Sequence, residues 1–237
     1  MNSDYFNKMG NEDLVDLVRV NPKYLAQKAP RDERVLAALQ EVDRKDFLPA
    51  ESRVLAYYDA PLDIGKDQTC SEPSTVAFME DVLELEEGMS VLEIGAGCGY
   101  HAAVTSHLIG PQGYLTSIEY IYTLAEMARR NLKRHFIYDC DKRLEVVCGD
   151  GSVGYAANAP YDRIYLACGV RLDRFDANIL TRQLNPEKGI LLFPEKEGRM
   201  RRLTFQAGVL TETTNYGETF FVPLVGVNSH NPPLLRN

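Results

Sequence analysis

The first third of the chain predicts helices separated by polar loops. In the runs NEDLVDLVRV, from Asn11, and RDERVLAALQEV, from Arg31, apolar residues recur at helical spacing and polar residues fill the opposite face. A polar loop containing Gly, Asp and Pro follows. Ser71-Glu72-Pro73 then begins a third apolar-periodic stretch, which predicts another helix.

From Ser90 onward, short apolar strands alternate with helices. SVLEIGAGCGY predicts a strand and a glycine-dense turn, and HAAVTSHLIG predicts the helix after it. The same alternation continues through GYLTSIEY (strand), IYTLAEMARRNLKRHF (helix), LEVVCGD (strand), YDRIYLACG (strand) and the helical pattern of LDRFDANILTRQL. The closely spaced segments GILLFPEK, RRLTFQAG and TFFVPLVGV are typical of antiparallel strands. The pattern therefore predicts an α/β fold: a doubly wound, Rossmann-like, mostly parallel sheet with antiparallel C-terminal strands.

Length and composition favour one domain. The chain has 237 residues, 45% of them hydrophobic, and it contains no linker-like or repeated segment. We expect a single domain over residues 1–237. Residues 1–75 supply the N-terminal helices and the polar loop, and residues 76–237 supply the sheet core and the C-terminal strands.

Charge and cysteine usage limit the classes of partner and the compartment. With 26 Lys and Arg against 34 Asp and Glu, the net charge is −8, which argues against nucleic acid as a partner. The acidic start lacks the pattern of a signal peptide, and no apolar run is long enough to span a membrane. Five cysteines without a C-x-x-C pair favour reduced thiols. We expect a cytoplasmic monomer with no membrane partner.

The glycine turn at Gly95, Gly97 and Gly99 is the first candidate site. It exposes backbone N–H groups at a helix start and lets a ligand approach closely, although tight packing of a helix on a strand asks for the same residues. Glu119 ends the next strand, 24 residues after Gly95, where an acid can accept hydrogen bonds from ribose hydroxyls. Tyr100 replaces the last glycine of the dinucleotide pattern, so a nucleoside without phosphates fits better.

A second acid follows the third strand of this unit. Asp150 and Gly151 stand in Gly149-Asp150-Gly151, where a carboxylate can accept a hydrogen bond from an exocyclic amine such as that of adenine. Asp-Gly is also the commonest turn dipeptide, so a purely structural turn is the alternative.

Taken together, these motifs resemble the class I S-adenosylmethionine-dependent methyltransferases. Further segments narrow the resemblance to the protein-L-isoaspartate O-methyltransferases, in order from about Arg34 to Gly226. The loop PLDIGKDQTCSEP is the most diagnostic, because it matches the family pattern P-L-x-I-G-x-x-Q-T-I-S-x-P except at Cys70. The other matching segments are RVLAALQEVDRKDFLP, VLEIGAGCGYHAAV, GDGSVGYAANAPYDRIYLA, ILTRQLNP and FFVPLVG.

This resemblance implies a cofactor, a reaction and a set of site residues. The cofactor would be S-adenosylmethionine, and the reaction would be O-methylation of the α-carboxyl of isoaspartyl residues in damaged proteins or peptides. Such a carboxylate is already ionised at neutral pH and needs no general base. Ser71 is then the candidate catalytic donor that orients the acceptor, with a helix N-cap as its alternative role. The implied cofactor-binding residues are Gln68, Thr69, Cys70, Ser71, Gly95, Gly97, Gly99, Glu119, Asp150 and Gly151.

Departures from the family pattern gather on the acceptor side. Glu72 places a carboxylate beside the site expected to bind the acceptor carboxylate, and the two negative charges would repel each other. The segment from Ala167 to Arg171 also differs from the family pattern. Arg171 is the candidate substrate-binding counter-charge, with a solvated arginine as the alternative. Two other hypotheses therefore stay open: a methyltransferase for another carboxylate, a metabolite or RNA, and a cofactor-binding protein without catalysis. We expect no metal site, since His101 and His107 lie six residues apart on different faces of one predicted helix.

Overall fold

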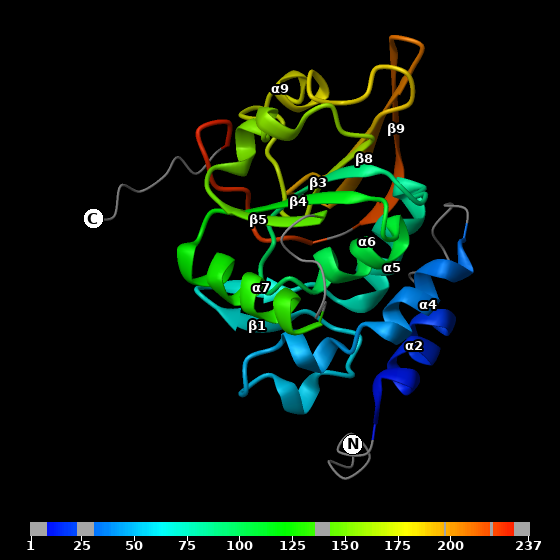
Figure 1. The fold of residues 1–237 in the computed structure, drawn as a ribbon, viewed down its shortest axis with the longest axis vertical. Coiled ribbons are helices and arrows are strands. Elements are labelled where there is room, and N and C mark those ends of the chain that lie inside the picture. Colours follow the sequence, from blue (N-terminus) through cyan, green and yellow to red (C-terminus); the bar gives the residue numbers. More distant parts are fainter. Residues whose placement is uncertain (1–8, 23–30, 136–142, 197, 219, 230–237) are drawn as a thin grey trace.

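A central sheet of seven strands organises the part of the chain described by this computed structural model, namely residues 9–22, 31–135, 143–196, 198–218 and 220–229 (Figure 1). The strand order is β5-β4-β3-β6-β7-β8-β9. The first five strands in this order are parallel, and β8 and β9 add antiparallel pairs, which confirms the predicted fold class. The strands are β3 (Ser90–Ile94), β4 (Tyr114–Glu119), β5 (Leu144–Cys148), β6 (Arg163–Leu166), β7 (Ile190–Pro194), β8 (Arg199–Gln206) and β9 (Val209–Glu218).

Helices cover both faces of this sheet, as expected for buried parallel strands. Figure 1 shows α5, α6 and α7 on one side and the short α9 on the other, with α2 and α4 packed outside α5 and α6. Except for α9, the predicted helices begin and end close to their expected positions, because their apolar residues are buried, along one face in α2, α4 and α7 and almost all round in α5 and α6. They are α2 (Asn11–Val20), α4 (Glu33–Glu41), α5 (Pro73–Leu83), α6 (Tyr100–Ile109), α7 (Tyr122–His135) and α9 (Asn178–Thr181). Short 3-10 helices lie at η1 (Arg44–Phe47), η2 (Arg53–Leu55), η3 (Gly151–Val153) and η4 (Ala156–Asn158).

Two elements differ from the prediction. The helical pattern of residues 172–184 yields only α9, because the Gln183 carbonyl accepts a hydrogen bond from the N–H of Tyr161 and draws the chain beside β6. The predicted last strand starts at Thr219, which lies outside the described residues; residues 220–227 form isolated bridges rather than a strand, and the last strand is β9. Ala207 and Gly208 adopt positive φ angles of 49° and 77°, so the chain reverses there and pairs with β8 immediately.

A small hairpin projects the polar loop toward the carboxyl edge of the sheet. Its strands are β1 (Leu62–Gly65) and β2 (Gln68–Cys70), which pair antiparallel. Lys66 and Asp67 between them have φ angles of 60° and 56°, as in the two-residue turns that match the twist of a hairpin. The hairpin buries Ile64 and Cys70 and leaves Thr69 exposed on its other face.

Arg44, at the start of η1, anchors the chain that leads to and follows this hairpin. Its side chain is fully buried. Nη1 donates to the carbonyl oxygens of Ala56 and Tyr58 at 3.2 and 2.7 Å. Nη2 donates to those of Ala60, Cys70 and Ser71 at 2.8, 3.2 and 2.9 Å. One guanidinium therefore supplies the donors that these loop carbonyls would otherwise lack.

We predict that Arg44→Met lowers the free energy of unfolding by about 3–5 kcal/mol, because several buried carbonyls lose donors worth about 1–3 kcal/mol each. Chemical denaturation measures this loss, and hydrogen exchange of residues 56–71 should accelerate. Arg174→Met is the control, since Arg174 is exposed and its contact with Asp173 spans 3.8 Å. Equal stability of the two variants would contradict the anchoring role.

Candidate functional site

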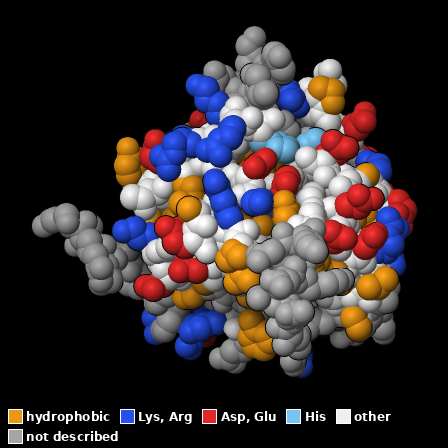
Figure 2. Space-filling model, turned by 90° about the horizontal axis from the view of Figure 1, so that it is seen from below, with side chains coloured by type: hydrophobic (Ala, Val, Ile, Leu, Met, Phe, Trp, Pro, Cys, Tyr) orange, Lys and Arg blue, Asp and Glu red, His pale blue; other side chains and the backbone are white. Residues whose placement is uncertain are grey.

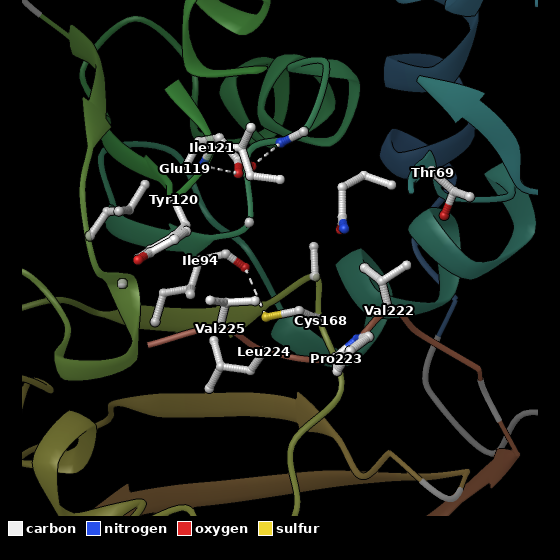
Figure 3. Close-up of a pocket in the computed structure, with 16 residues that line it drawn as sticks. Thr69, Ile94, Glu119, Tyr120, Ile121, Cys168, Val222, Pro223, Leu224 and Val225 are labelled. Atoms are coloured by element: carbon white, nitrogen blue, oxygen red, sulfur yellow. Dashed lines mark hydrogen bonds between the residues drawn. The ribbon is translucent and has the colours of Figure 1, made fainter. Parts of the chain in front are cut away.

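A pocket lies beside the glycine turn, where β3, β4 and β6 end. The space between its walls is about 580 Å³, part of which is open to solvent. Figure 3 shows Glu119, Tyr120 and Ile121 on one side, Val222 to Val225 on another, and Thr69 across the opening from Glu119. The lining residues are Gln68, Thr69, Ile94, Gly95, Gly97, Ile118, Glu119, Tyr120, Ile121, Gly151, Ala167, Cys168, Val222, Pro223, Leu224 and Val225.

The glycine turn forms the floor of this pocket. Gly95 and Gly97 have φ angles of 101° and 54°, which are strained for residues with a side chain. A Cβ on Gly97 would lie 3.3 Å from the Cδ1 atom of Ile64 in β1, so the absence of a side chain also lets the hairpin approach. The Gly95 N–H donates to the Ile118 carbonyl at 2.8 Å, which joins the turn to the end of β4.

The Glu119 carboxylate fastens the turn to the start of α7. One oxygen accepts from the N–H of Gly97 and the other from the N–H of Ile121, each at 2.9 Å. Burial raises the pKa of Glu119, while these backbone hydrogen bonds lower it. Each carboxylate oxygen has a second lone pair, so this group can still accept hydrogen bonds from a ligand in the pocket.

The wall formed by Val222 to Val225 depends on two loops that are distant in sequence. Gly169 donates to the Val222 carbonyl at 2.8 Å and accepts from the Leu224 N–H at 2.9 Å. The Asp150 carboxylate accepts from the N–H of Val227 at 2.8 Å and from that of Ser152 at 2.9 Å. A Cβ on Gly226 would lie 2.1 Å from Asp150, so only glycine permits this contact.

Of the residues proposed from the sequence, the structure brings six together in the pocket: Gln68, Thr69, Gly95, Gly97, Glu119 and Gly151. Gly151 packs tightly beneath it, since a Cβ there would lie 2.8 Å from the Ile94 side chain. The others, Cys70, Ser71, Gly99, Asp150 and Arg171, lie outside the lining.

Gly99 and Cys70 serve packing just behind the pocket. A Cβ on Gly99 would lie 3.1 Å from Leu132 and 3.3 Å from Ala128, so this glycine lets α6 begin against α7. Cys70 is buried, and a side-chain hydrogen bond with Cys98 lowers its pKa. The positive charge of Arg44 acts in the same direction.

Ser71 is half-buried and held through its backbone, because its carbonyl accepts from Arg44. The N-cap of α5 is Glu72 rather than Ser71, and Pro73 takes the first helical position. The Glu72 carboxylate accepts from the Thr75 hydroxyl at 2.8 Å, within its own helix.

Arg171 lies outside the pocket, at a separate surface cavity that it lines with Asp173 and Glu195. Its guanidinium donates to both carboxylate oxygens of Asp173 at 3.1 Å, and Lys196 lines the same cavity. A third, smaller hollow contacts Arg171 and shares Pro223 and Leu224 with the main pocket.

Ten of the sixteen residues that line the pocket were not proposed from the sequence. Tyr120 and Ile121 directly follow Glu119, so their position after the end of β4 could have indicated that they line the pocket. Cys168 extends from the end of β6, and burial raises the pKa of its thiol. The wall from Val222 to Val225 belongs to the segment FFVPLVG. This segment resembles the family, but the sequence alone did not assign it a role in the site.

Within the described residues, no cluster of three or more His, Cys, Asp or Glu side chains is arranged to hold a metal ion. The same residues contain no helix that could span a membrane. Four of the cysteines, Cys70, Cys98, Cys148 and Cys168, are free thiols, and Cys140 lies outside the described residues.

Comparison with known proteins identifies relatives over most of the chain. A protein-L-isoaspartate O-methyltransferase of Methanothermobacter thermautotrophicus is 41% identical over 204 residues, which cover 83% of this chain and 88% of the relative. A protein of the same name from Methanothrix thermoacetophila is 52% identical over 135 residues, which cover 57% of this chain and 62% of that protein.

A solved structure supports the fold. It is described as a putative protein-L-isoaspartate O-methyltransferase from Plasmodium falciparum in complex with S-adenosyl-L-homocysteine. The TM-score is 0.76 at 18% identity, and the match covers 92% of this chain and 99% of that structure. The family model for protein-L-isoaspartate(D-aspartate) O-methyltransferase matches residues 19–229. Nearly the whole described chain, including the pocket, thus lies within this match, and the protein belongs to the protein-L-isoaspartate(D-aspartate) O-methyltransferase family.

Proposed function

We propose that this protein is an S-adenosylmethionine-dependent methyltransferase that esterifies the α-carboxyl of L-isoaspartyl residues in damaged proteins or peptides. The observation that carries the proposal is the pocket in which Glu119, the glycine turn and the Gln68–Thr69 hairpin meet. Its residues fall within the segment matched by the family model.

The pocket fits a nucleoside cofactor. Glu119 retains acceptor capacity toward ribose hydroxyls, while Gly95 and Gly97 allow the methionine part to lie against the backbone. The apolar side chains of Ile94, Ile118 and Leu224 suit an adenine ring. When bound, S-adenosylmethionine supplies a methyl group activated by its sulfonium.

Asp150 contributes to this site from outside the lining. Its carboxylate holds the N–H of Val227, and the preceding residues from Val222 to Val225 form a wall of the pocket. We assign Asp150 with Gly151 to the adenine side of the cofactor site, where Asp150 positions that wall. Gly99 and Cys70 act similarly, as packing residues behind the glycine turn and the hairpin.

The acceptor needs orientation rather than a base. The pKa of an α-carboxyl is about 3.5, so at neutral pH the carboxylate oxygen can attack the methyl carbon directly. The new O–C bond replaces the S–C bond, and the sulfonium becomes a neutral thioether. We assign acceptor orientation to the hydroxyls of Thr69 and Ser71. Arg44 fixes the position of Ser71 through its carbonyl.

A different acceptor is the second candidate. The cavity with Arg171 and Lys196 lies outside the pocket, in the segment where the sequence departs from the family pattern. Arg171 and Lys196 line this cavity together with Asp173 and Glu195, so it offers groups of both charges to a polar acceptor. Such an acceptor would use the same cofactor site.

Domain organisation, oligomeric state and compartment are part of the proposed function. We propose that the chain acts as one domain and as a monomer, in the cytoplasm. Free thiols at all four described cysteines fit a reducing compartment.

We predict that Glu119→Ala weakens the binding of S-adenosylhomocysteine by about 1–3 kcal/mol, because it removes charge-assisted hydrogen bonds to the ribose. Isothermal titration calorimetry measures the change. Glu119→Gln should retain part of the affinity. Glu126→Ala on α7 is the control, since Glu126 pairs with Arg129 away from the pocket. Unchanged affinity in Glu119→Ala would remove the ribose assignment.

We predict methyl transfer from labelled S-adenosylmethionine to a peptide with an isoaspartyl linkage and none to the matched peptide with a normal aspartyl linkage. Cofactor binding is measured on the same sample. Tight binding without transfer to either peptide would favour a different acceptor or a non-catalytic role. Absence of binding would refute the proposed function altogether.

A further inference from the structure

Two histidines from neighbouring helices meet outside the proposed active site. His107 lies on α6, and His135 is the last residue of α7. Their Nε2 atoms are 3.3 Å apart, and their ring centroids are 5.6 Å apart with the planes at 62°. The two rings therefore face each other through these nitrogens.

This separation matches that of two ligands on one ion. Zinc binds histidine nitrogen at about 2.0–2.1 Å with tetrahedral angles, which places two such nitrogens about 3.3–3.4 Å apart. At this spacing the two nitrogens can share one proton at most. A modest tilt of each ring would direct both lone pairs at an ion in place of that proton.

An aromatic ring and several acidic side chains surround the pair. The Phe47 ring is buried and packs against His135 with centroids 5.4 Å apart. The carboxylate of Glu41 acts electrostatically on both histidines, and those of Asp43 and Asp46 act on His135. Figure 2 shows histidine side chains at the surface with acidic side chains close by.

We propose that His107 and His135 form a binding site for a divalent transition-metal ion such as Zn²⁺, with water as the remaining ligands. Imidazole suits ions of this class, whereas Mg²⁺ and Ca²⁺ prefer oxygen ligands. The bound ion cross-links α6, which starts after the glycine turn, to α7, which starts after the pocket wall at Ile121. It stabilises the fold without contacting the pocket, so the proposal is independent of the proposed function.

The test is a titration of the chelator-treated full chain with ZnCl₂, followed by calorimetry and thermal unfolding. One ion should bind per chain and raise the unfolding temperature. His107→Gln and His135→Gln should each weaken the binding at least tenfold and abolish the thermal shift. His230→Gln controls for loss of a histidine, and Cys148→Ser controls for binding by an exposed thiol. Both controls should bind as the unaltered chain does.

A second measurement keeps the test valid if either histidine variant fails to fold. The imidazole ¹⁵N resonances of His107 and His135 in the unaltered protein should both shift when Zn²⁺ is added. Failure of both rings to respond would overturn the proposal. So would full-affinity binding in His107→Gln or His135→Gln, or no binding by the unaltered chain.

Discussion

The guanidinium of Arg44 is the constraint on which the site depends. A loop that folds back on itself leaves carbonyl groups without partners, and burying them unpaired would be costly. Arg44 supplies their donors from a fully buried position and so fixes residues 56–60 and the backbone at Cys70 and Ser71. The same loop caps the next helix, because Asp59 accepts from the N–H of Ser74 at 2.9 Å. The hairpin that reaches the pocket is thus held at its base.

The parallel sheet supplies the other half of the pocket. The carboxyl ends of β3, β4 and β6 meet at one edge, which is where open α/β sheets bind their ligands. Glu119 uses both oxygens to tie the turn at Gly97 to the start of α7 at Ile121. The methyl transfer proposed there depends on the relative position of acceptor and methyl group more than on acid or base groups, and a rigid sheet edge can hold that position.

The sequence predicted the parts of this structure that depend on local patterns. The alternation of strands and helices, the glycine turn and the acid at the end of β4 are local signals, and they singled out Gly95, Gly97 and Glu119, which line one pocket in the structure. The family resemblance added Gln68 and Thr69. Long-range contacts could not be found in this way. The carbonyls held by Arg44 follow it by 12 to 27 residues, and the Val227 N–H held by Asp150 follows by 77.

Tertiary contacts also overrode two apparent patterns. Residues 172–184 have helical spacing, but the backbone pairing of Gln183 with Tyr161 shortens the helix to four residues. The segment from Val222 to Val225 is apolar like a strand, yet it crosses the end of the sheet and lines the pocket. His107 contacts His135 of another helix, 28 residues away in the sequence. The spacing of residues within one helix could not predict this contact.

The most direct measurement is a crystal structure of the protein with S-adenosylhomocysteine and an isoaspartyl peptide. The account predicts the ribose hydroxyls within hydrogen-bonding distance of the Glu119 carboxylate and the adenine beside Gly151. The peptide carboxylate should lie between the cofactor sulfur and the hairpin residues Thr69 to Ser71. A cofactor bound elsewhere, or a ribose turned away from Glu119, would contradict the account.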